Sequence, residues 1–188
     1  QSPENQIATD KVWHELAFGL ESLGYDTPTI RRRVAEMASF FGIQTWFYKS
    51  ITELSGGQKQ LLNLASVMVL QPKVLILDEP TSQLDPIAAS DFLATLGKIN
   101  RELGTTIILT EHRLEEAFGF ASRVAVMDGG KLLCTGTPAE VGAELKSSGN
   151  AMFLAMPAAM RIWAATDSTA ACPISVCDGR NWLLDYVK

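Results

Sequence analysis

The sequence lacks three features, and each absence argues against a class of protein. No apolar stretch approaches the roughly 20 residues that a membrane-spanning helix needs, so any membrane role depends on a partner protein. Basic residues are not in excess, because 16 Lys and Arg against 21 Asp and Glu give a net charge of -5, which argues against nucleic-acid binding. Cysteine is scarce, and three irregularly spaced thiols argue against a disulfide framework and indicate a reducing compartment.

The chain also lacks an initiator methionine, a signal peptide and an opening strand, so we expect it to begin inside a domain. Cys172 and Cys177 are spaced like half of a metal site, but no second pair of ligands follows them, which argues against that alternative. The 188 residues suffice for one domain with a short extra piece.

The best-defined element is an aliphatic run, residues 74–77, that leads into two carboxylates, Asp78 and Glu79. An uninterrupted apolar run predicts a strand buried on both faces, as in a parallel sheet covered by helices. Such sheets carry their chemistry at the carboxyl ends of the strands. Two acids there can divide two tasks, one holding a hydrated divalent cation and the other orienting a water for attack. The alternative is a pair of surface carboxylates that merely ends a core strand.

Helical and strand patterns alternate around this run, which predicts the α/β class. Thr9 or Asp10 is expected to cap the first helix. After residue 150 we expect an appended segment with a helix and a short hairpin around residues 172–184. The other elements expected are helices over residues 11–23, 27–41, 59–70, 86–103, 114–118 and 138–146, and strands over residues 105–110, 123–127 and 131–135.

Two further stretches carry candidate site residues. Ser55 can cap the helix that follows it, and Gly56 and Gly57 permit close backbone approach, so the helix start predicts an anion site. The alternative is a plain capped helix. His112 directly follows a predicted buried strand, where a histidine either takes part in site chemistry or simply bonds the backbone.

Five stretches follow one another along the chain: Gln6, LSGGQ at residues 54–58, VLILDEP at residues 74–80, SQLD at residues 82–85 and His112. Their order resembles that of the motifs of the ATP-binding cassette (ABC) ATPases. The stretch at residues 5–21, NQIATDKVWHELAFGLE, is similar to the ATPases of energy-coupling factor importers, which take up vitamins and trace metals. In the ABC ATPases the five stretches correspond, in order, to the Q-loop, the signature motif, the Walker B strand, the D-loop and the H-loop.

The resemblance implies a role for each catalytic position. Asp78 holds Mg²⁺ directly or through water, and Glu79 polarises the attacking water. His112 supports the γ-phosphate of ATP, while Gln6 contacts the metal region and reports it to a membrane partner. The implied cofactors are therefore ATP and Mg²⁺.

The resemblance also implies that two cassettes act together. Ser55, Gly56, Gly57 and Gln58 are expected to close on ATP held by the opposite cassette. Asp85 is expected at the same interface, where it couples the two sites.

One departure from the family pattern is large. The family's phosphate-binding loop, G-x-x-x-x-G-K-[ST], should precede Gln6, and no such stretch occurs in the 188 residues. We therefore predict a fragment that does not hydrolyse ATP alone. Its P-loop NTPase-like parallel sheet, flanked by helices and a helical subdomain, is expected to lack the amino-terminal strands and to leave apolar surface uncovered near residues 74–77 and 107–109.

The predicted domains are a partial ATPase domain over residues 1–149 and a connector or carboxyl-terminal extension over residues 150–188. Within the first, residues 7–53 form the helical subdomain and residues 54–149 the rest.

The predicted function is that of the ATP-hydrolysing subunit of an importer, peripheral to the cytoplasmic face of the cell membrane. Its expected partners are a second cassette, a transmembrane scaffold and a substrate-binding membrane protein, with Trp46, Phe47 and Tyr48 as candidate contacts. The same aromatics are also typical of packing within a small helical layer. The alternative function is a soluble or regulatory cassette without a transport role.

Overall fold

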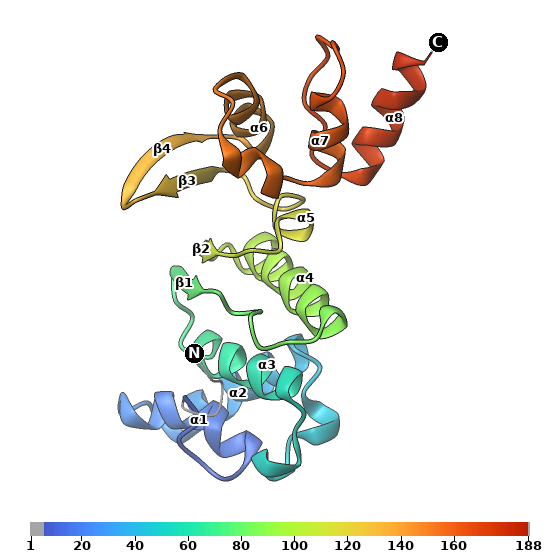
Figure 1. Cartoon of the computed structure of the whole chain (residues 1–188). Helices are drawn as coiled ribbons and strands as arrows, with labels where there is room; N and C mark the ends of the chain where they lie inside the picture. The colour runs from blue at the N-terminus through green and yellow to red at the C-terminus, as the bar shows by residue number, and fades with distance from the viewer. Residues whose placement is uncertain (1–5, 188) are drawn as a thin grey trace. The chain divides into compact units, whose positions relative to one another are not determined.

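The computed structural model describes residues 6–187, and the chain divides into two compact units, Gln1–Glu111 and His112–Lys188. The first unit contains helices and a parallel pair of strands (Figure 1), and all of the predicted site residues except His112 lie within it. The second contains an antiparallel hairpin and four helices. Helices thus alternate with strands as the sequence predicts.

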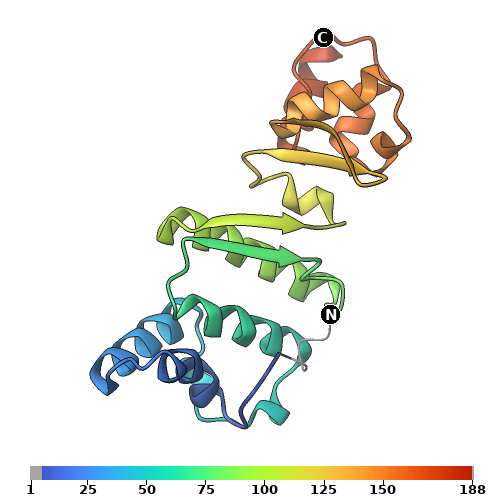
Figure 2. The ribbon, with the colours of Figure 1, turned by 90° about the vertical axis from the view of Figure 1, so that its left-hand side faces the viewer.

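The first unit combines a helical layer with a two-stranded parallel sheet. Helix α1 packs on α2 and α3, and α3 also contacts α4, which lies along the strands (Figure 2). Its elements are α1 (Val12–Ser22), α2 (Thr27–Phe40), the short 3₁₀ helices η2 (Gln44–Trp46) and η3 (Ile51–Glu53), α3 (Gly56–Met68), β1 (Val74–Asp78), α4 (Pro86–Leu103) and β2 (Thr106–Thr110).

Local capping signals place most helix ends close to the predicted positions. Helix α4 begins where the Asp85 carboxylate accepts hydrogen bonds from the backbone N–H groups of Ile87 and Ala88, both at 3.0 Å. It ends at Gly104, whose φ of 69° continues the chain in the left-handed region that favours glycine.

The predicted cap of the first helix is wrong. Helix α1 begins after Lys11, without any side-chain cap from Thr9 or Asp10. The N–H groups of Val12 and Trp13 instead donate to backbone carbonyls of Lys49 and Phe47, at 3.3 and 3.2 Å. A distant loop therefore satisfies the helix start in place of a local cap.

The sheet of the first unit is covered on one face. Strands β1 and β2 pair in parallel from Val74 opposite Thr106 to Asp78 opposite Thr110. Leu75 is buried, whereas Ile76 is 71% exposed and Ile108 is 52% exposed. The prediction of burial on both faces is therefore wrong in this structure, and the prediction of uncovered apolar surface near these residues is confirmed.

The second unit has one apolar core. Cys172 lies in it, and burial raises the pKa of its thiol to about 11. Its elements are α5 (Leu114–Ala117), β3 (Val124–Asp128), β4 (Lys131–Gly136), α6 (Pro138–Ser147), the 3₁₀ helix η4 (Ala151–Ala155), α7 (Ala158–Ala164) and α8 (Val176–Tyr186). Its core side chains are Phe118, Val126, Cys134, Val141, Leu145, Met156, Met160, Trp163 and Cys172.

The short hairpin predicted around residues 172–184 is wrong, because helix α8 occupies most of that range. Ser175 and Asp178 form a capping box, in which each side chain accepts a hydrogen bond from the other's backbone N–H. Cys177 lies exposed on α8, and the described residues include no cluster of three or more side chains suited to hold a metal ion. The domain boundaries predicted from the sequence stay a prediction.

None of the helices between residues 6 and 187 is both long and apolar enough to cross a membrane.

Candidate functional site

The two acids that end β1 are held by one threonine of β2. The Thr110 hydroxyl donates a hydrogen bond to Asp78 Oδ1 at 2.6 Å. The same hydroxyl oxygen accepts a hydrogen bond from the backbone N–H of Glu79 at 3.1 Å. The Thr110 carbonyl accepts from the same N–H, also at 3.1 Å. Both acids are exposed at the carboxyl edge of the sheet, as predicted.

The backbone turns sharply at Glu79. Its φ of 43° lies in the left-handed region, which costs a residue with a side chain roughly 1–2 kcal/mol. The bonds from Thr110 maintain this conformation, which ends the strand and sets the direction of the Glu79 side chain. Such conformations cluster at functional sites.

The turn after the acids is fixed from two sides. Gln60 of α3 donates from Nε2 to the Pro80 carbonyl at 3.0 Å. The buried Thr81 hydroxyl donates to Glu111 Oε2 at 2.7 Å. The position of the acids therefore depends on α3 as well as on the sheet.

The signature stretch forms the start of α3, a helix of 13 residues. Ser55 and Gln58 form a capping box: Ser55 N–H donates to Gln58 Oε1 at 3.0 Å, and Gln58 N–H to Ser55 Oγ at 3.3 Å. Ser55 and Gly56 are exposed. The amino end of α3 thus presents polar groups and a favourable dipole at the surface.

Gly57 lies against the start of α4. A Cβ added there would lie 3.1 Å from the Ala88 Cβ, so any larger residue at this position requires α3 or α4 to shift by a few tenths of an ångström. A hollow of about 240 Å³ opens beside this contact, lined on one side by Ser55, Gly57 and Gln58 and on the other by Ala88, Asp91 and Thr95. Asp85, the cap of α4, does not line the hollow but accepts a hydrogen bond from the backbone N–H of Ala88, which does.

Gln6 is exposed, and its side-chain oxygen accepts a hydrogen bond from Asn63 Nδ2 at 3.5 Å. Asn63 is buried on α3. Helix α3 therefore carries the signature stretch at its start and contacts both Gln6 and the turn after the acids.

Sequence reasoning missed three of these residues. For Thr110 the sequence contains a weak indication, because it is the polar residue that ends an apolar strand. Gln60 and Asn63 had none, because their partners lie 20 and 57 residues away in the chain. His112 is exposed and begins the second unit, and its support of the γ-phosphate stays a prediction.

The exposed acids suit a magnesium ion. Carboxylate oxygens are the ligands that Mg²⁺ prefers, and the hydroxyl bond to Asp78 is the kind of contact that orients a metal-binding carboxylate. The phosphate groups of a nucleotide are less well provided for, because the 188 residues include no G-x-x-x-x-G-K-[ST] loop to hold them.

A parallel strand that ends in two acids, beside a helix that starts with Ser-Gly-Gly, defines part of an α/β nucleotide-binding domain. The family model described as ABC transporter matches residues 2–82. An ABC transporter ATP-binding protein of Bacillus anthracis is 53% identical over 145 residues, which cover 77% of this chain and 26% of that protein. The chain is therefore similar to part of an ABC transporter ATP-binding protein, and residues 2–82 carry part of an ABC transporter ATPase domain.

Two other comparisons agree. The energy-coupling factor transporter ATP-binding protein EcfA1 of Caldanaerobacter subterraneus is 43% identical over 148 residues, 78% of this chain and 52% of that protein. The structure of cbiO1 from Clostridium perfringens, described as part of the ABC transporter complex cbiONQ, aligns with a TM-score of 0.71 and 34% identity over 86% of this chain and 64% of that one. The chain thus spans about a quarter of the Bacillus relative and about half of EcfA1.

Proposed function

We propose that the protein is the ATP-hydrolysing subunit of an ABC-type importer of the energy-coupling factor type. The observation that carries the proposal is the pair Asp78 and Glu79, held by Thr110 at the exposed end of β1. The similarity to ABC transporter ATP-binding proteins supports the choice of ATP as substrate.

In this proposal the two acids have different tasks. Asp78 holds Mg²⁺, with the Thr110 hydroxyl fixing the orientation of its carboxylate. Glu79 accepts a proton from the attacking water, and the fixed backbone at Glu79 aims its side chain. Mg²⁺ supplies charge neutralisation on the phosphate oxygens when it is bound.

Gln6 and His112 act around the same γ-phosphate. Gln6 senses the phosphate and metal region, and its contact with Asn63 places its amide next to α3. The order of the motifs assigns support of the γ-phosphate to His112.

The signature residues serve a second cassette. Ser55, Gly56, Gly57 and Gln58 bind the phosphates of ATP held by the opposite cassette, and Asp85 couples the two sites. The exposure of Ser55 and Gly56 at a helix start supports this role, because such an end attracts anions from outside the chain.

The importer assignment is supported by the similarity to EcfA1 and to cbiO1. The solute is a vitamin or a trace metal, bound by a separate membrane protein, and this subunit is peripheral to the cytoplasmic face of the membrane. The contact with the transmembrane scaffold includes Tyr48, which is 80% exposed, whereas the buried Trp46 supports the helical layer from within.

The proposal predicts that Glu79→Gln abolishes ATP turnover. In the protein with its complete natural sequence we expect kcat to fall at least about 100-fold, the range for loss of a general base, because the amide cannot accept the proton. Phosphate release measured under saturating Mg²⁺ and ATP checks this. Glu102→Gln, which changes an exposed carboxylate on α4, is the matched control and should leave kcat unchanged. A Glu79→Gln protein with the same kcat as Glu102→Gln would contradict the role of Glu79, and an unsubstituted protein without ATP turnover would favour a regulatory cassette.

A further inference from the structure

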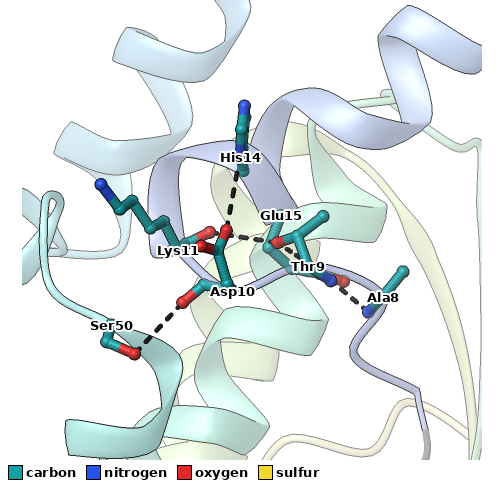
Figure 3. A network of polar contacts seen from close by, with 7 residues as sticks. All are labelled: Ala8, Thr9, Asp10, Lys11, His14, Glu15 and Ser50. Atoms are coloured by element: carbon teal, nitrogen blue, oxygen red, sulfur yellow. Dashed lines mark hydrogen bonds and ion pairs between the residues drawn. The ribbon is translucent and has the colours of Figure 1, made fainter.

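Glu15 is a buried carboxylate, only 5% exposed, on helix α1. Its Oε2 atom accepts three hydrogen bonds from the segment before the helix: from Ala8 N at 3.1 Å, from Thr9 N at 2.9 Å and from Thr9 Oγ1 at 2.9 Å (Figure 3). Burying a carboxylate costs several kcal/mol unless hydrogen bonds compensate, so these donors are what permits the burial.

The helix itself does not need these bonds. The first N–H groups of α1, those of Val12 and Trp13, are satisfied by backbone carbonyls of the loop at residues 47–49. Glu15 reaches back six and seven residues, well past the start of the helix at Lys11. Its carboxylate is therefore directed at the segment before α1 and not at the helix end.

That segment carries Gln6. Ala8 and Thr9 follow Gln6 by only two and three residues, so fixing their backbone N–H groups limits where the Gln6 amide can go. The side chain of Gln6 in turn meets Asn63 on α3. Gln6 therefore lies between two anchors, the Glu15 carboxylate on α1 and the Asn63 amide on α3.

We propose that Glu15 is a positioning residue for Gln6: its buried carboxylate holds residues 8 and 9 against α1 and so keeps the Gln6 amide where it can sense the nucleotide. The inference rests on the proposed function, which assigns that sensing to Gln6. Glu15 touches neither nucleotide nor metal in this arrangement, and it acts only through the backbone of residues 6–9.

A double-mutant cycle tests the proposal in the protein with its complete natural sequence. Glu15→Gln keeps the side-chain volume and one acceptor oxygen but removes the negative charge, which weakens the three charge-assisted hydrogen bonds that Oε2 accepts from Ala8 and Thr9. Because small displacements of positioning groups cost one to two orders of magnitude in rate, we expect kcat for ATP to fall about tenfold, with KM unchanged. In a Gln6→Ala background the same substitution should cause no further fall.

The control is Glu21→Gln, an exposed carboxylate on the same helix, which should change nothing. Thr9→Val removes the hydroxyl contacts with Glu15 and with the Lys11 carbonyl but keeps both backbone N–H bonds to Glu15, so it should lower kcat in the same direction but less. If Glu15→Gln fails to fold, Thr9→Val takes its place in the double-mutant cycle with Gln6→Ala. Equal losses in the presence and absence of Gln6 would overturn the proposal, because they would show a general structural effect.

Hydrogen exchange at the Ala8 and Thr9 amides gives a readout that does not depend on ATP. Glu15→Gln should speed exchange there about tenfold, as expected for loss of a hydrogen bond worth roughly 1.4 kcal/mol, while Glu21→Gln should not. Unchanged exchange in Glu15→Gln would overturn the proposal. Faster exchange in a protein that shows no ATP turnover would support the anchoring by Glu15 and contradict the proposed function instead.

Discussion

At the carboxyl end of β1, one hydroxyl group connects both acids of the site. The Thr110 hydroxyl donates to Asp78 and accepts the backbone N–H of Glu79. A single side chain thus fixes the orientation of the metal-binding carboxylate and the backbone that aims the base. Asp78 and Glu79 are exposed, so the bonds matter for geometry more than for the free energy of unfolding.

Thr110→Val should therefore weaken magnesium binding more than it weakens the fold. Valine keeps the β-branched shape that suits β2 but cannot donate to Asp78. We expect the Mg²⁺ concentration for half-maximal ATP turnover to rise about tenfold, the lower range for loss of a residue that orients a metal ligand. A Mg²⁺ titration of the protein with its complete natural sequence measures this.

Thr106→Val makes the same chemical change at the exposed start of the same strand and should leave the titration unaltered. A Thr110→Val protein whose titration matches that control would show that the hydroxyl does not orient Asp78.

Individual site residues were predictable only where the chain itself marks them. Asp78 and Glu79 directly follow an apolar run, and Ser55 precedes a helix, so neighbouring residues identify their positions. Glu15 looks like any other helical carboxylate in the sequence, because its burial depends on how α1 packs against α2 and α3. Asn63 contacts Gln6 only after the chain has folded.

At the scale of helices, the contact between α3 and α4 depends on Gly57. The two helices approach so closely that an added Cβ would lie 3.1 Å from Ala88, whereas a Cβ at Gly56 would meet nothing within 4 Å. The two glycines are neighbours in one motif, but only Gly57 is in tight contact with another helix.

Gly57→Ala should consequently destabilise the first unit, and Gly56→Ala should not. Replacing glycine by alanine in a helix usually stabilises by roughly 0.5–1 kcal/mol, and overpacking costs about 1–3 kcal/mol. We expect a net loss of about 1 kcal/mol for Gly57→Ala and no loss for Gly56→Ala. Urea unfolding followed by circular dichroism measures the free energy of unfolding of both variants. Equal values for Gly57→Ala and Gly56→Ala would show that α4 moves to accommodate the added methyl group without loss of stability.

Most helices and strands were predictable because their ends carry local signals. Asp85-Pro86 and Gly104 bound α4 at the predicted residues, and Thr137-Pro138 starts α6. The start of α1 was not predictable, because its N–H groups bond to a loop about 35 residues further along the chain. The Ser175–Asp178 capping box was a local signal for α8, and the hairpin prediction overlooked it.

At the scale of the whole molecule, the 188-residue chain by itself should not hydrolyse ATP. Its residues include the acids, the signature stretch and His112, but no loop of the kind that holds the β- and γ-phosphates. We expect phosphate release by the purified chain to equal that of its Glu79→Gln variant. Turnover that is lost in Glu79→Gln and in Ser55→Ala would contradict this prediction.

The sequence predicted which strand carries the acids but not how the sheet is covered. An unbroken aliphatic run is compatible with burial on both faces, and the pattern alone cannot tell which layers pack on it. In the structure, burial alternates along β1, with Leu75 inside and Ile76 outside. Coverage of a sheet is a property of the assembled layers, which local pattern does not specify.

The uncovered face of that sheet also affects how the chain behaves in solution. Val74, Ile76 and Ile108 are each more than half exposed on two neighbouring strands. Together they form an exposed apolar patch. Copies of the chain attract one another through such a surface even when each is correctly folded. We therefore expect the solubility of the 188-residue chain to be limited by association through this surface.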